Sequence, residues 1–116
     1  MKFHPASPFL AVSLVLTPLA IAKIPIKSGD KVAFLGDSIT QQGKSSPSGY
    51  VNLVSDALAT HGVKVEVIGA GISGHKSNQM LERLERDVLS KKPQWMTLSC
   101  GVNDVWHGEK GVSLED

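Results

Sequence analysis

Three short segments of the chain carry residues that are suited to acyl transfer. Ser38 lies in residues 36–40, GDSIT, directly after an apolar run, so its hydroxyl is expected to face a cleft at the end of a strand. Residues 69–74, GAGISG, offer backbone N–H groups that can converge on a negatively charged oxygen. Asn103, in residues 101–104, adds a side-chain amide. A serine nucleophile and such donors are what ester cleavage through an oxyanion requires.

Ser38 and its neighbour Asp37 also have purely structural interpretations. Serine is common in tight turns, where it stabilises the backbone instead of reacting. We interpret Asp37, beside Ser38, as a turn-capping carboxylate. Three suitable segments after three successive predicted strands favour the catalytic interpretation of Ser38.

In this order and spacing, the three segments resemble the first three sequence blocks of the GDSL/SGNH hydrolase family of esterases. The resemblance covers nearly all of residues 23–116. It implies that Ser38 is the nucleophile and one oxyanion donor through its backbone N–H, with the Gly74 N–H and the Asn103 amide completing the oxyanion hole. The family's glycine block usually opens with asparagine, where this chain has Gly69, and this departure affects the bracing of the cleft. No cofactor is implied, and no His, Cys or carboxylate pair has convincing metal-ligand spacing.

The resemblance also implies that part of the catalytic machinery lies outside this chain. In the family an Asp-x-x-His block near the C-terminus supplies the general base, well beyond Asp116. The sequence therefore predicts the N-terminal part of a truncated esterase, nearly inactive alone because a serine hydroxyl needs a base. A non-catalytic fragment or binding module with the same fold is the alternative.

The histidines within the chain are given structural roles. Asp104 and His107 have the Asp-x-x-His spacing but lie inside the third segment, where we expect a local loop contact. His75 is interpreted as a solvent-exposed residue at a helix start and His61 as a helix-end residue.

Hydrophobic patterning predicts three strands to position these loops. Residues 32–35 are continuously apolar and predict a strand buried on both faces, residues 63–68 alternate up to Gly69, and residues 95–100 are mostly apolar. With two intervening helices the order is β-α-β-α-β, which predicts an open parallel sheet with its site at the strands' carboxyl ends. The resemblance implies a flavodoxin-like, three-layer α/β/α fold of which only this first portion is present. Such a half-sheet is expected to expose an edge and apolar surface.

Two helices are predicted between the strands, after a loop over residues 41–48. The first has Ser46 as N-cap, Pro47 at its first position and Gly62 at its C-terminal end, with inward residues Tyr50, Leu53, Val54, Ala57 and Leu58. The second is capped by Asn78 and ends at residues 91–93, with an outer Glu82–Arg86 pair and inward residues Leu81, Leu84 and Val88.

The N-terminus predicts export. Residues 9–16 form a short apolar run, followed by Pro18 and the small-residue tripeptide 20–22, which is typical of a secretory signal peptide over residues 1–22. The run is shorter than the roughly 20 residues of a membrane span. Residues 23–116 then form one exported domain, periplasmic or extracellular, and its single cysteine, Cys100, excludes an internal disulfide.

Other functions are less well supported by the sequence. Residues 69–74 also match the dinucleotide-binding pattern Gly-x-Gly-x-x-Gly, but residues 93–95, where that fold needs an acidic residue, are Pro-Gln-Trp. A net charge of +1 without a basic patch argues against nucleic-acid binding. We expect a small-molecule, carbohydrate or lipid ester as substrate, and of these we favour a carbohydrate acetyl ester.

Overall fold

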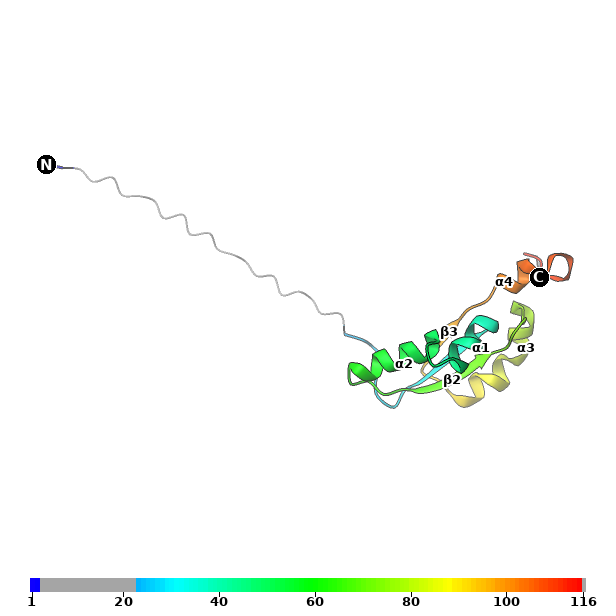
Figure 1. The fold of residues 1–116 in the computed structure, drawn as a ribbon, viewed down its shortest axis with the longest axis horizontal. Coiled ribbons are helices and arrows are strands. Elements are labelled where there is room, and N and C mark those ends of the chain that lie inside the picture. The colour runs from blue at the N-terminus through cyan, green and yellow to red at the C-terminus, as the bar shows by residue number, and fades with distance from the viewer. Residues whose placement is uncertain (3–22, 116) are drawn as a thin grey trace.

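A parallel three-stranded sheet organises the described part of the chain (Figure 1). The computed structural model describes residues 1–2 and 23–115, so the predicted signal peptide lies almost wholly outside the described residues. The strands β1 (Lys31–Gly36), β2 (Glu66–Gly71) and β3 (Trp95–Leu98) are arranged in the order β2-β1-β3. Leu35 of the central strand is paired with Ala70 on one side and Leu98 on the other.

Strand β1 is buried on both faces, which gives the fold its three layers. Ala33 and Leu35 pack with α3 (Ser77–Asp87) through a cluster that includes Met80 and Val88. The alternate residues Val32 and Phe34 pack against α2 (Tyr50–Thr60), and the rings of Phe34 and Tyr50 meet edge to face at 6.0 Å. The predicted buried strand and the three-layer α/β arrangement are therefore confirmed.

Strand β2 lies later in the sequence than its alternating pattern predicts. It begins at Glu66 instead of Val63 and continues through Gly69 to Gly71. The reason is its register with β1, in which Lys31 is paired with Glu66 and Gly36 with Gly71. Pairing with a buried central strand outweighs the low strand propensity of glycine.

A helix occupies most of the loop predicted over residues 41–48, and residues 46–48 remain a turn. Helix α1 spans Ser38–Ser45 and begins because the Asp37 side chain accepts a hydrogen bond from Ile39 N at 2.9 Å. The helix packs closely on the strand end, since a Cβ at Gly36 would collide with the Thr40 side chain. The residue composition does not predict this helix, because its stability comes from a cap and a tertiary contact.

Helix α2 begins later than predicted and is more open. Its N-cap is Gly49, whereas Ser46, the predicted cap, follows the end of α1. Gly62 ends the helix with a φ of +80°, as expected of a left-handed C-terminal glycine. Of the predicted inward residues, Leu53, Val54 and Ala57 are exposed, and the fully buried residue is Val51.

Helix α3 also differs from its prediction in cap and in inward face. Lys76 is the N-cap instead of Asn78, and its N–H donates to Gln79 Oε1 at 3.1 Å. Val88 is buried and Leu84 half-buried as predicted, but Leu81 is 71% exposed. The helix ends at Asp87, before a 3-10 turn, Leu89–Lys91.

The charge pairing outside α3 also differs from its prediction. Arg86 pairs with Asp87, with 2.7 Å between Nε and Oδ1, and not with Glu82 as the helical spacing predicts. Asp87 also receives a hydrogen bond from Arg83, at 3.2 Å. One carboxylate therefore joins two arginines at the end of the helix.

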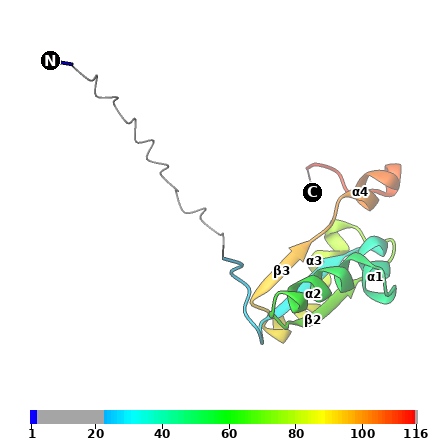
Figure 2. The ribbon, with the colours of Figure 1, turned by 60° about the vertical axis from the view of Figure 1, so that its left-hand side comes forward.

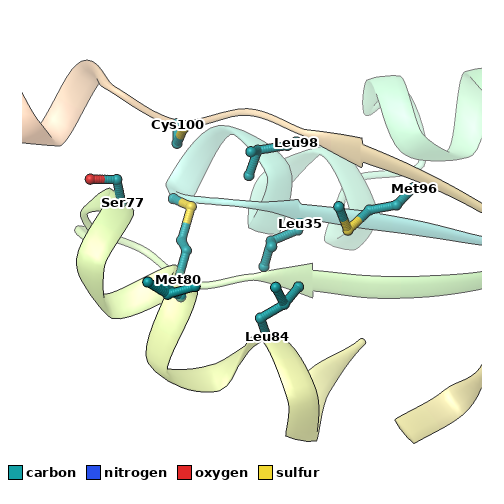
Figure 3. A pocket seen from close by; sticks show the side chains of 8 residues that line it. Leu35, Ser77, Met80, Leu84, Met96, Leu98 and Cys100 are labelled. Atoms are coloured by element: carbon teal, nitrogen blue, oxygen red, sulfur yellow. The ribbon is translucent and has the colours of Figure 1, made fainter. Parts of the chain in front are cut away.

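Strand β3 lies at the edge of the described sheet (Figure 2). Its residues are all exposed. It ends at Leu98, two residues before the predicted end, and is followed by α4 (Val102–Trp106) and a 3-10 turn, Gly108–Lys110. An apolar cavity of about 220 Å³ lies between β3 and α3, with Leu35, Met80, Leu84 and Leu98 around it (Figure 3). The expected exposed apolar surface is present. No helix in the described part of the chain is long and apolar enough to cross a membrane.

Candidate active site

Ser38 is the first residue of α1 and lies directly beyond the carboxyl end of β1. The N–H groups in the first turn of a helix have no acceptor within the helix. The Ser38 N–H is therefore available to a group bound beyond the carboxyl end of β1. Asp37 is only 2% exposed and holds the turn, since its Oδ1 accepts from Ile39 N. The predicted turn-capping role of Asp37 is confirmed.

The glycine-rich segment is tied to the same end of the sheet. Ile72 N donates to Gly36 O at 3.0 Å, and Ser73 N donates to Gln41 Oε1 of α1 at 2.7 Å. Gly74 follows with a φ of +77°, a conformation that residues with a side chain rarely adopt. Its exposed backbone is thus presented beside the turn that carries Ser38.

Asn103, on α4, bridges these two segments. Its Nδ2 donates to His75 O at 3.1 Å, one residue after Gly74, and lies 3.4 Å from Asp37 Oδ2, one residue before Ser38. The structure therefore brings together the three segments that carry Ser38, Gly74 and Asn103. This follows from the sheet, because the carboxyl ends of parallel strands share one edge.

Asp104 and His107 do not form the local contact that their spacing predicts. Asp104 Oδ1 accepts from Ser77 N at 2.8 Å, which joins α4 to the first turn of α3. His107 is exposed at the C-terminal end of α4. Residues distant in sequence compete successfully for this carboxylate because an unpaired N–H at a helix start is a strong donor.

His75 is half-buried, and not the exposed residue predicted. Its Nδ1 accepts a hydrogen bond from Arg83 Nε at 3.2 Å. Arg83 was not among the predicted site residues, although it is only 3% exposed. Its signal in the sequence is its place three residues after Met80, on the apolar face of α3, where an arginine is rarely found without a specific partner.

A serine just beyond a strand end, with backbone N–H groups and a side-chain amide at the same edge of the sheet, is the arrangement expected of a serine hydrolase. The GDSL-like lipase/acylhydrolase family matches residues 34–115, and the chain belongs to this family. The dinucleotide-binding alternative is not favoured, since Gly69 and Gly71 lie within β2 and pair with β1.

Similar proteins are esterases, of which the chain spans about half the length. An acetylxylan esterase of Geobacillus stearothermophilus is 37% identical over 93 residues, which are 70% of this chain and 42% of that protein. The esterase TesA of Pseudomonas aeruginosa is 33% identical over 82 residues, 70% of this chain and 41% of that protein.

Solved structures agree with this relationship. An acetylxylan esterase structure from Geobacillus stearothermophilus superposes with a TM-score of 0.70 at 34% identity, covering 79% of this chain and 51% of that one. The acetyl xylan esterase AlAXEase is 48% identical with a TM-score of 0.64, covering 70% of this chain and 43% of that one. Catalytic mutants of the Geobacillus enzyme have been solved in which a serine, an aspartate or a histidine is replaced by alanine.

Proposed function

We propose that this chain carries the nucleophile and the oxyanion hole of a serine esterase. The observation that carries the proposal is the bridge made by Asn103, whose amide contacts Asp37 Oδ2 and His75 O. This bridge places an amide donor between the residue before Ser38 and the residue after Gly74. Ester cleavage requires such an arrangement of nucleophile and donors.

The proposed reaction is a two-step acyl transfer. Ser38 Oγ attacks the ester carbonyl carbon and its proton passes to a base, while the carbonyl oxygen becomes an oxyanion held by the N–H groups of Ser38 and Gly74 and by Asn103 Nδ2. Collapse expels the alcohol, which takes up that proton, and leaves an acyl group on Ser38. Water then attacks the acyl group, releasing the acid and restoring the hydroxyl.

The amide of Asn103 has one hydrogen suited to this role. Its contact with His75 O, at 3.1 Å, is an ordinary hydrogen bond, whereas the 3.4 Å separation from the Asp37 carboxylate is long for a charge-assisted one. An oxyanion would therefore compete with Asp37 for the second hydrogen.

The base is proposed to come from an Asp-x-x-His segment beyond these residues. His75 uses Nδ1 as an acceptor for Arg83, and His107 lies exposed at the end of α4. In the Geobacillus enzyme the replaced aspartate and histidine are three positions apart, which is the same spacing. The chain alone should therefore have little activity. We further propose that the protein is exported, and that its substrate is a carbohydrate acetyl ester in preference to a lipid ester.

The test joins the full chain to the remaining part of the Geobacillus acetylxylan esterase and measures hydrolysis of p-nitrophenyl acetate and acetylated xylo-oligosaccharide. The fusion is expected to turn over both substrates, and Ser38→Ala to lose at least about 1000-fold in kcat. Ser45→Ala, at the exposed end of the same helix, is the matched control and should retain activity. A folded fusion whose residual activity is the same with and without Ser38 would refute the proposal.

The chain by itself supplies the complementary measurement. Ser38-dependent turnover by the unfused chain would place a base within it, and His75→Gln and His107→Gln would identify which histidine acts. A folded but inactive chain, together with an active fusion, would support a base beyond these residues.

A further inference from the structure

One buried cation joins the ends of the two strands that lead into the candidate site. Arg83, on α3, donates from Nη2 to Gly36 O and from Nη1 to Ala70 O, both at 2.9 Å. Gly36 is the last residue of β1, and Ala70 is the penultimate residue of β2. Both carbonyls lie at strand ends, shortly before the segments that carry Ser38 and Gly74.

The third nitrogen of the same guanidinium reaches His75, the residue that follows the glycine-rich segment. Arg83 Nε donates to His75 Nδ1 at 3.2 Å, and the His75 carbonyl in turn accepts from Asn103. Arg83 thus contacts the two strand ends directly and the third segment through one intermediate. It touches none of the atoms proposed to react.

The buried charge is balanced without leaving the helix. Asp87 Oδ2 lies 3.2 Å from Arg83 Nη1, one turn further along α3. A buried arginine is tolerated only when its charge is paired and its polar atoms are hydrogen-bonded. Here Asp87 pairs the charge, and each nitrogen of the guanidinium has a hydrogen-bond partner. Lysine has no planar fork, so it cannot bind two carbonyls, an imidazole and a carboxylate at once.

We propose that Arg83 is a positioning residue that fixes the relative placement of the Ser38 turn and the Gly74 loop. This inference rests on the proposed esterase function. Oxyanion donors work only when they are held in place before the reaction, and displacements on the order of 1 Å cost about 100-fold in rate. The Arg83 side chain is hydrogen-bonded to the strand ends from which both segments begin, at Gly36 and Ala70.

The first test measures amide hydrogen exchange by NMR in the full chain, because it needs no activity. In Arg83→Lys and Arg83→Ala, the amides of Ile72, Ser73 and His75 should exchange at least about tenfold faster relative to that of Phe34. Guanidinium ion at tens of millimolar should restore their protection in Arg83→Ala, whereas ammonium should not. Val88→Ala, which opens a core cavity at the far end of α3, should accelerate exchange uniformly.

The second test measures kinetics in the fusion described above. Arg83→Lys should lower kcat about 10- to 100-fold with KM within about twofold, since transition-state donors and not substrate binding are disturbed. Val88→Ala, compared with Arg83→Lys under conditions in which both variants have lost the same stability, should leave kcat near the wild-type value. Parallel behaviour of Arg83→Lys and Val88→Ala in exchange or in kcat would overturn the inference. If the wild-type fusion has no Ser38-dependent turnover, the esterase proposal fails, and exchange alone decides whether Arg83 positions the loops.

Discussion

Strands β2 and β3 flank the same central strand in the same parallel direction, yet one side of the sheet is closed and the other is open. On β2, Ile68 and Ala70 are each 6% exposed and pack with α3, whereas Leu98 on β3 is 56% exposed. The segments of Ser38 and Gly74 are anchored on the closed side by main-chain bonds and by Arg83. Asn103 follows the open side, and its amide donates to the Asp37 carboxylate and to the His75 carbonyl.

The difference teaches that the two halves of the proposed oxyanion hole are held with unequal strength. The Ser38 and Gly74 donors are set by a packed core, which is rigid. The Asn103 donor lies on α4, which follows β3, and β3 has apolar cavities of about 220 and about 420 Å³ on its two faces. Substitutions on the two sides should therefore have very different consequences.

The largest expected effect is a core truncation on β1. Phe34→Ala should lower the free energy of unfolding by about 3–5 kcal/mol, since Phe34 is 2% exposed and packs on α2. Leu98→Ala on β3 should lower it by less than about 1 kcal/mol, because half of that side chain is already in water. Urea unfolding of the full chain, followed by circular dichroism, measures both values. Similar losses for the two variants would contradict the closed and open description.

The next effect concerns the two carboxylates that cap helices beside the site. Asp37→Ala should destabilise by about 1–2 kcal/mol, because it removes the cap of α1. It should also shift the Asn103 side-chain amide resonances in an NMR spectrum, through the loss of Asp37 Oδ2. Asp104→Ala removes the contact to Ser77 N and should cost about 1 kcal/mol while leaving the amide of Ile39 unchanged. Equal changes at Ile39 in both variants would show that the two sides are coupled.

A smaller effect is expected from pH. Hydrogen bonds from Arg86, and then from Arg83, lower the pKa of Asp87 from 3.8 to about 2. A carboxyl group with a lowered pKa in the folded state stabilises the fold above pH 4, and this contribution is lost as the pH falls through 2. The loss should be about 1 kcal/mol once solvent screening is allowed for. Unfolding measured between pH 5 and pH 2 should be less pH-dependent in Asp87→Asn, and an unchanged slope would refute the assignment.

The smallest effect on stability is expected on the open side. Leu98→Lys should change the free energy of unfolding by no more than about 0.5 kcal/mol, as is usual for exposed positions. It should nevertheless reduce binding of an apolar dye and concentration-dependent association, since it places a charge on an exposed edge strand. Lys64→Gln, at an exposed position outside β2 and β3, is the control and should change neither property.

Much of the site was predictable from the sequence because it depends on chain order. The short apolar run of β1, ended by Gly36, favours a strand buried on both faces, and parallel strands place their carboxyl ends together. Segments that follow successive strands must then meet, which is how Ser38, Gly74 and Asn103 come to one edge. The turn role of Asp37 is equally local and is confirmed by its bond to Ile39 N.

The tertiary structure decided the features whose partners are distant in the chain. Helix α1 forms from residues of loop-like composition because Asp37 caps it and because it packs on the end of the sheet. Arg83 and His75 acquire their placement from carbonyls and side chains that periodicity cannot name. Asp104 binds the first turn of α3 instead of its neighbour His107. Local patterns fix which faces are apolar, but hydrogen bonds across the fold depend on distances that exist only after the layers have packed.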